Sequence, residues 1–135
     1  MGLIVKKTIL VVAFFILSTF TAHSKAKNEY QYFSSTDKGK VYVSVDSISK
    51  DGNIRTAWVL AVFNETSITG TKKQESLKEF DCKSHTSKTL KLIAYNEQDK
   101  ITETVQSAYS LIPKTAYEVG TMEELLATAI CKEKE

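Results

Sequence analysis

Several short segments of the chain alternate between apolar and polar residues, a period of two that is typical of β-strands. The first clear segment is Lys40–Asp46, whose three valines fall on one face of a strand. The turn signal Asp51-Gly52-Asn53 and the apolar segment Arg55–Phe63 follow it. Strands on either side of an Asp-Gly turn predict a β-hairpin. The nearly continuous apolar character of the second strand predicts a central strand covered on both faces, with Trp58 in the core.

Further segments with the same alternation predict more strands. They are Ser76–Ser84, Thr89–Asn96 and Ile101–Tyr109, and Glu29–Phe33 is a candidate first strand. The polar connection Asn96–Lys100 is short enough to join two of them as a hairpin.

The hydrophobic pattern changes to a helical period after Pro113, the only proline in the chain. Thr121 and Glu124 are spaced as in a capping box, in which the two residues bond to each other's backbone amides. Apolar residues then recur at helical spacing over Met122–Ile130, with Cys131 at the end of the stripe. The sequence therefore predicts an α+β fold, an antiparallel sheet of five to six strands with a C-terminal helix packed on it.

The N-terminal segment has the composition of a secretory signal peptide. Lys6 and Lys7 precede the uninterrupted apolar run Ile9–Leu17, and small residues suited to signal-peptidase cleavage follow. We therefore expect residues 1–24 to be a signal peptide, with cleavage near 24–26. An uncleaved N-terminal anchor is the alternative. No cysteine lies near the cleavage region, so we expect no lipid anchor.

The remaining domain, residues 27–135, is expected in the periplasm or outside the cell. The full chain carries 18 Lys+Arg and 16 Asp+Glu, and removal of Lys6 and Lys7 with the leader leaves 16 of each. A neutral domain of this kind disfavours a nucleic-acid partner.

The two cysteines of the chain, Cys82 and Cys131, have only one possible pairing. An oxidising compartment favours a disulfide, and closing a loop of about 50 residues contributes roughly 4 kcal/mol in the chain-entropy model. Two thiols with His85 make a poor metal site, so we expect none. A catalytic Cys-His pair needs a free thiolate, which the disulfide removes. No known catalytic or phosphate-binding motif occurs, so we expect no enzyme activity and no cofactor.

Four features occur in order along the chain. Tyr42–Ile48 has the form Y-x-x-x-D-S-I, and Trp58 follows it. Phe80-Asp81-Cys82 brings in the first cysteine, and Pro113 precedes a helix that closes on Ala129-Ile130-Cys131. Together they resemble the surface-adhesin protein E family, small exported domains of Gram-negative bacteria.

This resemblance implies a six-stranded antiparallel sheet with a helix tied to it by a disulfide, and a tendency to form homodimers. It also implies binding of the host proteins vitronectin and laminin through a segment around the first cysteine, which corresponds here to residues 70–89. The candidate binding residues in that segment are Lys72, Lys73, Lys78, Lys83 and Lys88. Acidic residues are interleaved with them, and the family's lipid-anchored cysteine is absent.

Two classes of function therefore remain open. The first is an exported, non-enzymatic binding domain whose lysines attract an acidic host segment. The alternative is a periplasmic accessory or inhibitor domain with a bacterial envelope partner. Apart from this choice, the purely structural interpretation of the lysines is a solvated rim of an edge strand, where they discourage edge-to-edge pairing.

Overall fold

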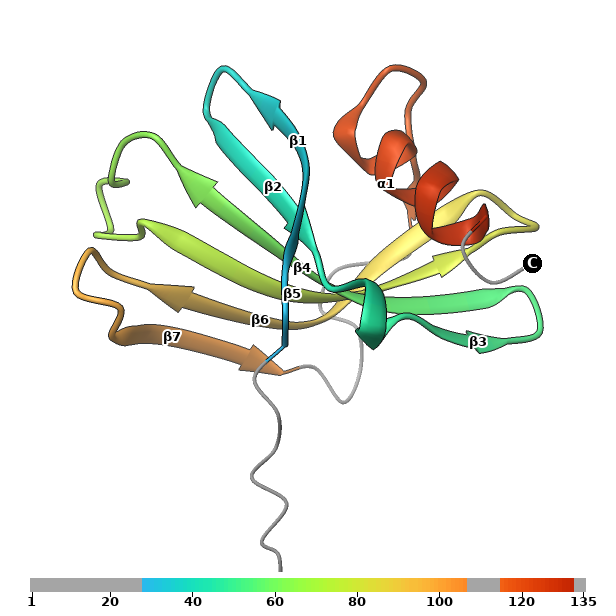
Figure 1. Ribbon diagram of the computed structural model, residues 1–135, viewed down its shortest axis with the longest axis horizontal. Coiled ribbons are helices and arrows are strands. Elements are labelled where there is room, and N and C mark those ends of the chain that lie inside the picture. The colour runs from blue at the N-terminus through green and yellow to red at the C-terminus, as the bar shows by residue number, and fades with distance from the viewer. Residues whose placement is uncertain (1–27, 107–114, 133–135) are drawn as a thin grey trace, which may run out of the picture.

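The computed structural model describes residues 28–106 and 115–132. The expected signal peptide and Pro113 lie outside the described residues. Six strands form a continuous antiparallel sheet in the order β1-β2-β4-β5-β6-β7 (Figure 1). Their bounds are Gln31–Thr36 (β1), Gly39–Val43 (β2), Ile54–Phe63 (β4), Lys73–Asp81 (β5), Thr86–Tyr95 (β6) and Ile101–Gln106 (β7).

Three further elements complete the architecture. The short strand β3 (Ser49–Asp51) pairs with β4, and β8 (Thr115–Ala116) pairs with β6. The helix α1 (Met122–Lys132) follows. The sheet is strongly twisted, its strands fan apart on both sides of a narrow waist, and α1 lies over the half that contains β3 (Figure 1). The predicted α+β fold is confirmed.

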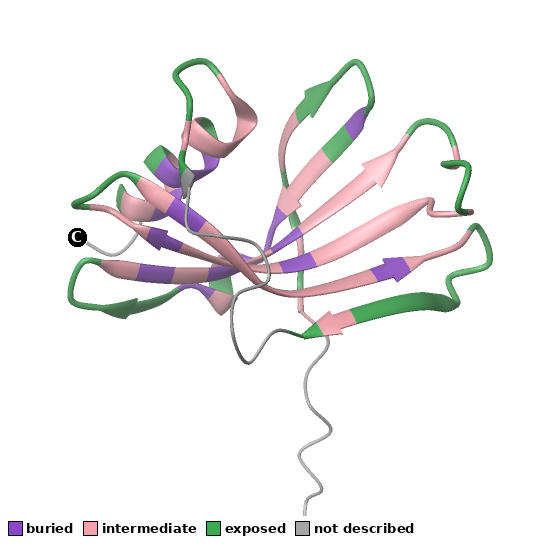
Figure 2. Cartoon of the chain, turned by 180° about the vertical axis from the view of Figure 1, so that it is seen from behind, coloured by how far each residue is buried: buried purple, intermediate pink, exposed green. Residues whose placement is uncertain are grey.

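The core lies between α1 and one face of the sheet. Alternate side chains of β4 point toward the helix, so Ala57 and Val59 are buried there together with Phe80 of β5. The helix contributes Leu126, Ala127 and Ile130 to the same cluster. Figure 2 shows that buried residues concentrate along the inner strands, whereas β7 at the edge is largely exposed.

The prediction that Trp58 lies in the core is wrong. Trp58 alternates with Ala57 and Val59 along β4, so its side chain lies on the sheet face opposite α1. It is only partly buried and lies outside the buried cluster. The strand is central, as predicted, but only its α1-facing side chains Arg55, Ala57 and Val59 are buried.

The predicted strand Lys40–Asp46 is interrupted. Pairing along β2 ends at Val43, and a 3-10 turn, η1 (Val45–Ser47), leads into β3. The hydroxyl of Ser47 donates to the carbonyl of Ser44 at 2.6 Å and accepts the amide of Trp58 at 2.9 Å. These side-chain bonds replace the strand ladder. The Asp-Gly turn therefore joins β3, rather than β2, to β4.

The strand pair β5 and β6 is shifted along the chain from the strands that the alternation predicted. β5 runs from Lys73 to Asp81 rather than from Ser76 to Ser84, and β6 begins at Thr86 rather than Thr89. The turn between them is fixed by Asp81, whose Oδ1 accepts the amides of Lys83 and Ser84, two and three residues ahead, at 3.0 Å each. An aspartate that bonds to the backbone ahead of it is a strong turn former.

The capping box of α1 is present with one difference. The hydroxyl oxygen of Thr121 accepts the amide of Glu124 at 3.3 Å, as predicted. Glu124 reaches back to the amide of Gly120 at 2.6 Å, instead of that of Thr121, because the Thr121 amide already donates to the carbonyl of Glu118. Both caps satisfy backbone donors at the start of the helix.

The disulfide between Cys82 and Cys131 is present, with a Cα–Cα distance of 5.9 Å. Cys82 directly follows β5, and Cys131 lies in the last turn of α1. The bond therefore ties the end of the helix to the β5–β6 turn, at the end of the sheet rather than across its middle.

Candidate functional site

The predicted binding segment, residues 70–89, forms β5, the turn after it and the start of β6. Two of its lysines lie on β5, which spans roughly 25–30 Å, and the others lie just before it, in the turn and on β6. The structure therefore does not gather them into one patch. They occupy three separate places, described in turn below. The interpretation of these lysines as the rim of an edge strand is wrong, because β5 and β6 are inner strands of the sheet.

Lys72 and Lys73 lie at the start of β5. The ammonium of Lys72 donates to the backbone carbonyl of Asn64, a neutral partner, at 2.8 Å, and it forms no ion pair with a described residue. Lys73 forms an ion pair with Asp99 at 2.7 Å and lies over the ring of Tyr95, 5.2 Å from its centroid. Of these two lysines, only Lys73 is ion-paired, so the charge of Lys72 is the one available to a binding partner.

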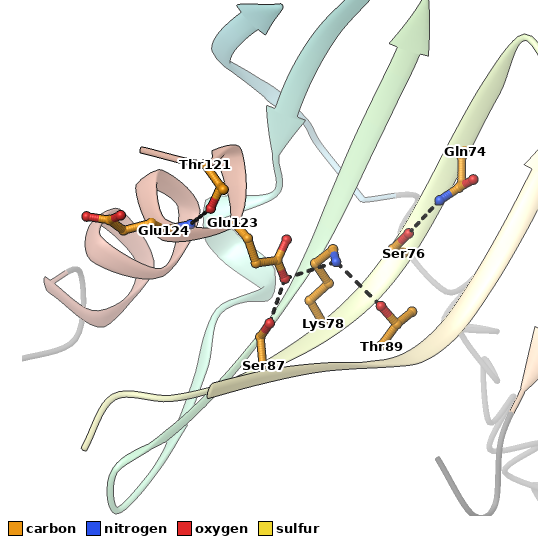
Figure 3. A network of polar contacts seen from close by, with 8 residues as sticks. All are labelled: Gln74, Ser76, Lys78, Ser87, Thr89, Thr121, Glu123 and Glu124. Carbon is orange, nitrogen blue, oxygen red and sulfur yellow. Dashed lines mark hydrogen bonds and ion pairs between the residues drawn. The ribbon is translucent and has the colours of Figure 1, made fainter. Parts of the chain in front are cut away.

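Lys78 lies in a polar groove between β5, β6 and the N-terminus of α1 (Figure 3). Its ammonium approaches Glu123 Oε1 at 3.1 Å and Thr89 Oγ1 at 3.4 Å. Ser87 donates to the same Glu123 oxygen at 2.8 Å. The groove has a volume of about 450 Å³, and Lys88 also lines it. The lysine at its centre is thus engaged in joining the helix to the sheet.

The last two lysines differ in their surroundings. Lys88 pairs with Glu79 directly opposite it on β5, at 3.4 Å. Lys83 lies in the β5–β6 turn, is exposed, and forms no ion pair with a described residue. Lys83 is therefore the most accessible of the five candidates.

A second hollow lies over the disulfide, between the β5–β6 turn, the segment before α1 and the helix itself. We call it the disulfide pocket. Its volume is about 340 Å³, and it is lined by Cys82, His85, Tyr117, Val119, Glu124, Ala127, Thr128, Cys131 and Lys132. No local pattern predicts this pocket, because its walls come from two segments more than 30 residues apart that meet through the disulfide and the pairing of β8 with β6.

The wall of the disulfide pocket is held by backbone and ring contacts. His85 has φ 57°, a left-handed conformation that is unusual outside glycine, and its carbonyl accepts the amide of Tyr117 at 3.4 Å. The two rings stack with centroids 5.9 Å apart and planes 18° apart. Burial, together with the charges of Asp81 and Glu124, raises the pKa of Tyr117.

Comparison with known proteins gives one match. Residues 18–132 match the family model for surface-adhesin protein E. The chain belongs to the surface-adhesin protein E family. No curated protein and no solved structure matches it. Family membership indicates an adhesin-like protein, at the surface or secreted, that binds host proteins, and it suggests a non-enzymatic role.

In this family member, Cys82 cannot act as a nucleophile beside His85, because its sulfur is bonded to Cys131. Among residues 28–106 and 115–132, no group of three or more His, Cys, Asp or Glu side chains is arranged to hold a metal ion. The same residues include no helix that is long and apolar enough to cross a membrane.

The sheet face opposite α1 carries a polar clamp that sequence reasoning missed. The carboxylate of Glu75 accepts one hydroxyl from Tyr30 and another from Tyr95, each at 2.6 Å. Burial, with the hydrogen bond to Glu75, raises the pKa of both tyrosines, that of Tyr95 to about 12. Because Tyr30 directly precedes β1, this clamp joins the start of that edge strand to β5 and β6.

Proposed function

We propose that this protein is an exported, non-enzymatic domain that binds host matrix proteins, with vitronectin and laminin as the first candidates. In this proposal residues 1–24 are a signal peptide cleaved near 24–26, and residues 27–135 are the binding domain. The observation that carries the proposal is the match of residues 18–132 to a family of surface adhesins.

The β5–β6 hairpin is the proposed contact region, and the surroundings of its lysines rank them. Three of the five are ion-paired: Lys73, Lys78 and Lys88. Binding a partner carboxylate at these three would first require breaking an existing pair, which offsets the gain. Lys72 and Lys83 have no such cost, so we expect them to contribute most to attraction of an acidic partner segment.

The test is surface plasmon resonance of the mature domain against immobilised vitronectin and laminin. We expect saturable binding that weakens with rising salt, because screening acts on exposed charges. Lys72→Glu and Lys83→Glu should each weaken binding several-fold, on the order of 1 kcal/mol per contact.

The matched control is Lys40→Glu, the same charge change at an exposed position of β2 outside the hairpin. If neither host protein binds at micromolar concentration, the proposed partners are wrong. If Lys40→Glu weakens binding as much as Lys83→Glu, net charge rather than the hairpin governs the interaction. A bacterial protein recovered instead from a periplasmic extract would favour the accessory-domain alternative.

A further inference from the structure

The residues at the start of β1 are attached to a strand that is not their neighbour in the sheet. Tyr30 directly precedes β1, and its hydroxyl donates to Glu75 of β5 at 2.6 Å. In the strand order, β2 and β4 lie between β1 and β5. Adjacent strands are about 4.8 Å apart, so the bond between Tyr30 and Glu75 passes over these two strands. We call residues 28–32, which make this crossing, the N-terminal strap.

The N-terminal strap crosses a largely apolar part of the sheet face that α1 does not cover. Leu60 of β4 lies directly opposite Glu75 on one side and Tyr42 of β2 on the other. Trp58 is two residues before Leu60 on the same strand, so it lies on the same face. The side chains of Tyr42, Trp58 and Leu60 are partly buried, although they lie outside the core cluster. The strap passes above this apolar strip.

A β-bulge separates the strap from the rest of β1. The pairing with β2 changes register between Tyr32 and Ser34, so Phe33 is the extra residue. A bulge bends its strand and interrupts the ladder of backbone hydrogen bonds. The side chain of Phe33 packs against the core cluster. The strand is therefore anchored at the bulge, and the strap that precedes it has a hinge there.

The strap has few attachments other than the polar clamp. Most of its residues are exposed, namely Glu29, Gln31 and Tyr32. Two of them pair with β2, and the ring of Tyr32 meets that of Tyr42 edge-on, with ring centroids 5.8 Å apart. Segments with few buried contacts open at a lower free energy than the whole domain. A hydrogen bond to an ionised carboxylate is roughly twice as strong as a neutral one, so the bond from Tyr30 to Glu75 decides how often the strap opens.

We propose that the N-terminal strap is a lid, hinged at Phe33 and latched by Glu75, that opens and closes over Trp58 and Leu60 while the sheet and α1 stay folded. The proposal goes beyond the proposed function and does not depend on which partner the domain binds. The latch and the core cluster lie on opposite faces of the sheet, so release of the latch leaves the packing of α1 unchanged. Opening uncovers the apolar strip, and the latch thereby controls access to it.

Native-state amide exchange of the ¹⁵N-labelled mature domain, followed by NMR, tests whether the strap opens by itself. In the wild type, the amide of Gln31, which pairs with Val43, should exchange faster than the amides of β4. Its rate should be insensitive to low urea concentrations, because a local opening exposes little surface, whereas exchange in β4 should accelerate with urea. If the Gln31 amide depends on urea as the β4 amides do, the strap opens only when the whole domain unfolds, and the proposal is overturned.

Tyr30→Phe tests the latch, because it removes the bonding hydroxyl and keeps the ring. Exchange at Gln31 should become about tenfold faster or more, the effect of losing one hydrogen bond to a charged group. The matched control is Tyr32→Phe, whose lost hydroxyl bonds the exposed Ser35 at 3.1 Å. The control should change the rate by less than about threefold. If Tyr30→Phe accelerates exchange no more than the control does, Glu75 is not the latch and the proposal is overturned.

A mature domain that begins at Phe33, and therefore lacks the strap, tests what the strap covers. Its tryptophan emission, which comes from Trp58 alone, should shift to longer wavelength because water then reaches the indole ring. Unchanged emission from a shortened domain with a native circular dichroism spectrum would overturn the proposal, since the strap would then cover nothing. If the shortened domain does not fold, the exchange measurements on the full mature domain decide the proposal without it.

Discussion

Loss of the bond between Cys82 and Cys131 should destabilise the protein strongly. The bond closes a loop with a sequence separation of 49 residues. In the chain-entropy model, a loop of this length restricts the unfolded chain by about 4 kcal/mol at 25 °C. Small domains have a net stability of about 5–15 kcal/mol, so this one bond accounts for a large share.

The packing of α1 determines whether the helix stays folded on the sheet when the disulfide is absent. Two large apolar side chains of the helix, Leu126 and Ile130, are each 2% exposed. Burial of two such residues contributes about 3–6 kcal/mol, which is comparable to the contribution of the disulfide. We therefore expect the double variant Cys82→Ser/Cys131→Ser to fold with α1 in place, but with its free energy of unfolding lower by about 4 kcal/mol.

Urea denaturation of both proteins measures this difference. Fluorescence of Trp58, the only tryptophan, reports on the sheet, and far-UV circular dichroism reports on the helix as well. The two signals should change together and at a lower urea concentration in the variant. Adding reductant should lower the stability of the wild type by a similar amount and leave the variant unchanged. A difference below about 1 kcal/mol between the two proteins would refute the reasoning.

Four other substitutions probe the core, two glycines and the polar clamp. Phe80 has no exposed surface, so Phe80→Ala should lower the free energy of unfolding in urea by about 3–5 kcal/mol. Gly39→Ala should greatly lower the melting temperature, because a Cβ there would collide with the Val62 carbonyl oxygen. In Gly52→Ala the new Cβ meets no atom within 4 Å, so the free energy of unfolding should fall by only about 1–2 kcal/mol, because Gly52 has a left-handed φ of 58°. The pKa of Tyr95 is raised from 10.0 to about 12 on folding, so the stability it contributes is present below pH 10 and is lost as pH rises from 10 to about 12. Urea titrations across that range should show a smaller loss for Tyr95→Phe, and an equal loss would contradict this assignment.

The predicted lysine site illustrates why spacing along a chain does not define a surface. In the sequence, Lys72 and Lys83 belong to one basic stretch, interleaved with acidic residues. In the fold, an extended strand separates them by its full length, and acidic side chains of other elements pair with the lysines between them. Glu123 lies 45 residues from Lys78 in the chain, so its pairing with that lysine could not be foreseen from local pattern.

The disulfide pocket could not be found from the sequence for a related reason. His85 lies three residues after Cys82 in the sequence, but its stacking partner Tyr117 lies in a segment with no regular pattern. The hydropathy pattern does not predict the left-handed backbone of His85 or the exposure of Val119. Both depend on how the chain packs around the disulfide.

The amino-acid sequence by itself determined the elements of this protein and their class. Alternation of residues defined most of the strands, the spacing from Met122 to Ile130 defined the helix, and two cysteines allowed one pairing. These properties are local or have a single solution, so they can be read along the chain. Only the tertiary structure decided that Trp58 lies outside the core, that Lys78 is paired, and that a pocket forms above the disulfide. Each of these depends on which face of a twisted sheet meets α1, a choice made by the summed packing of distant residues.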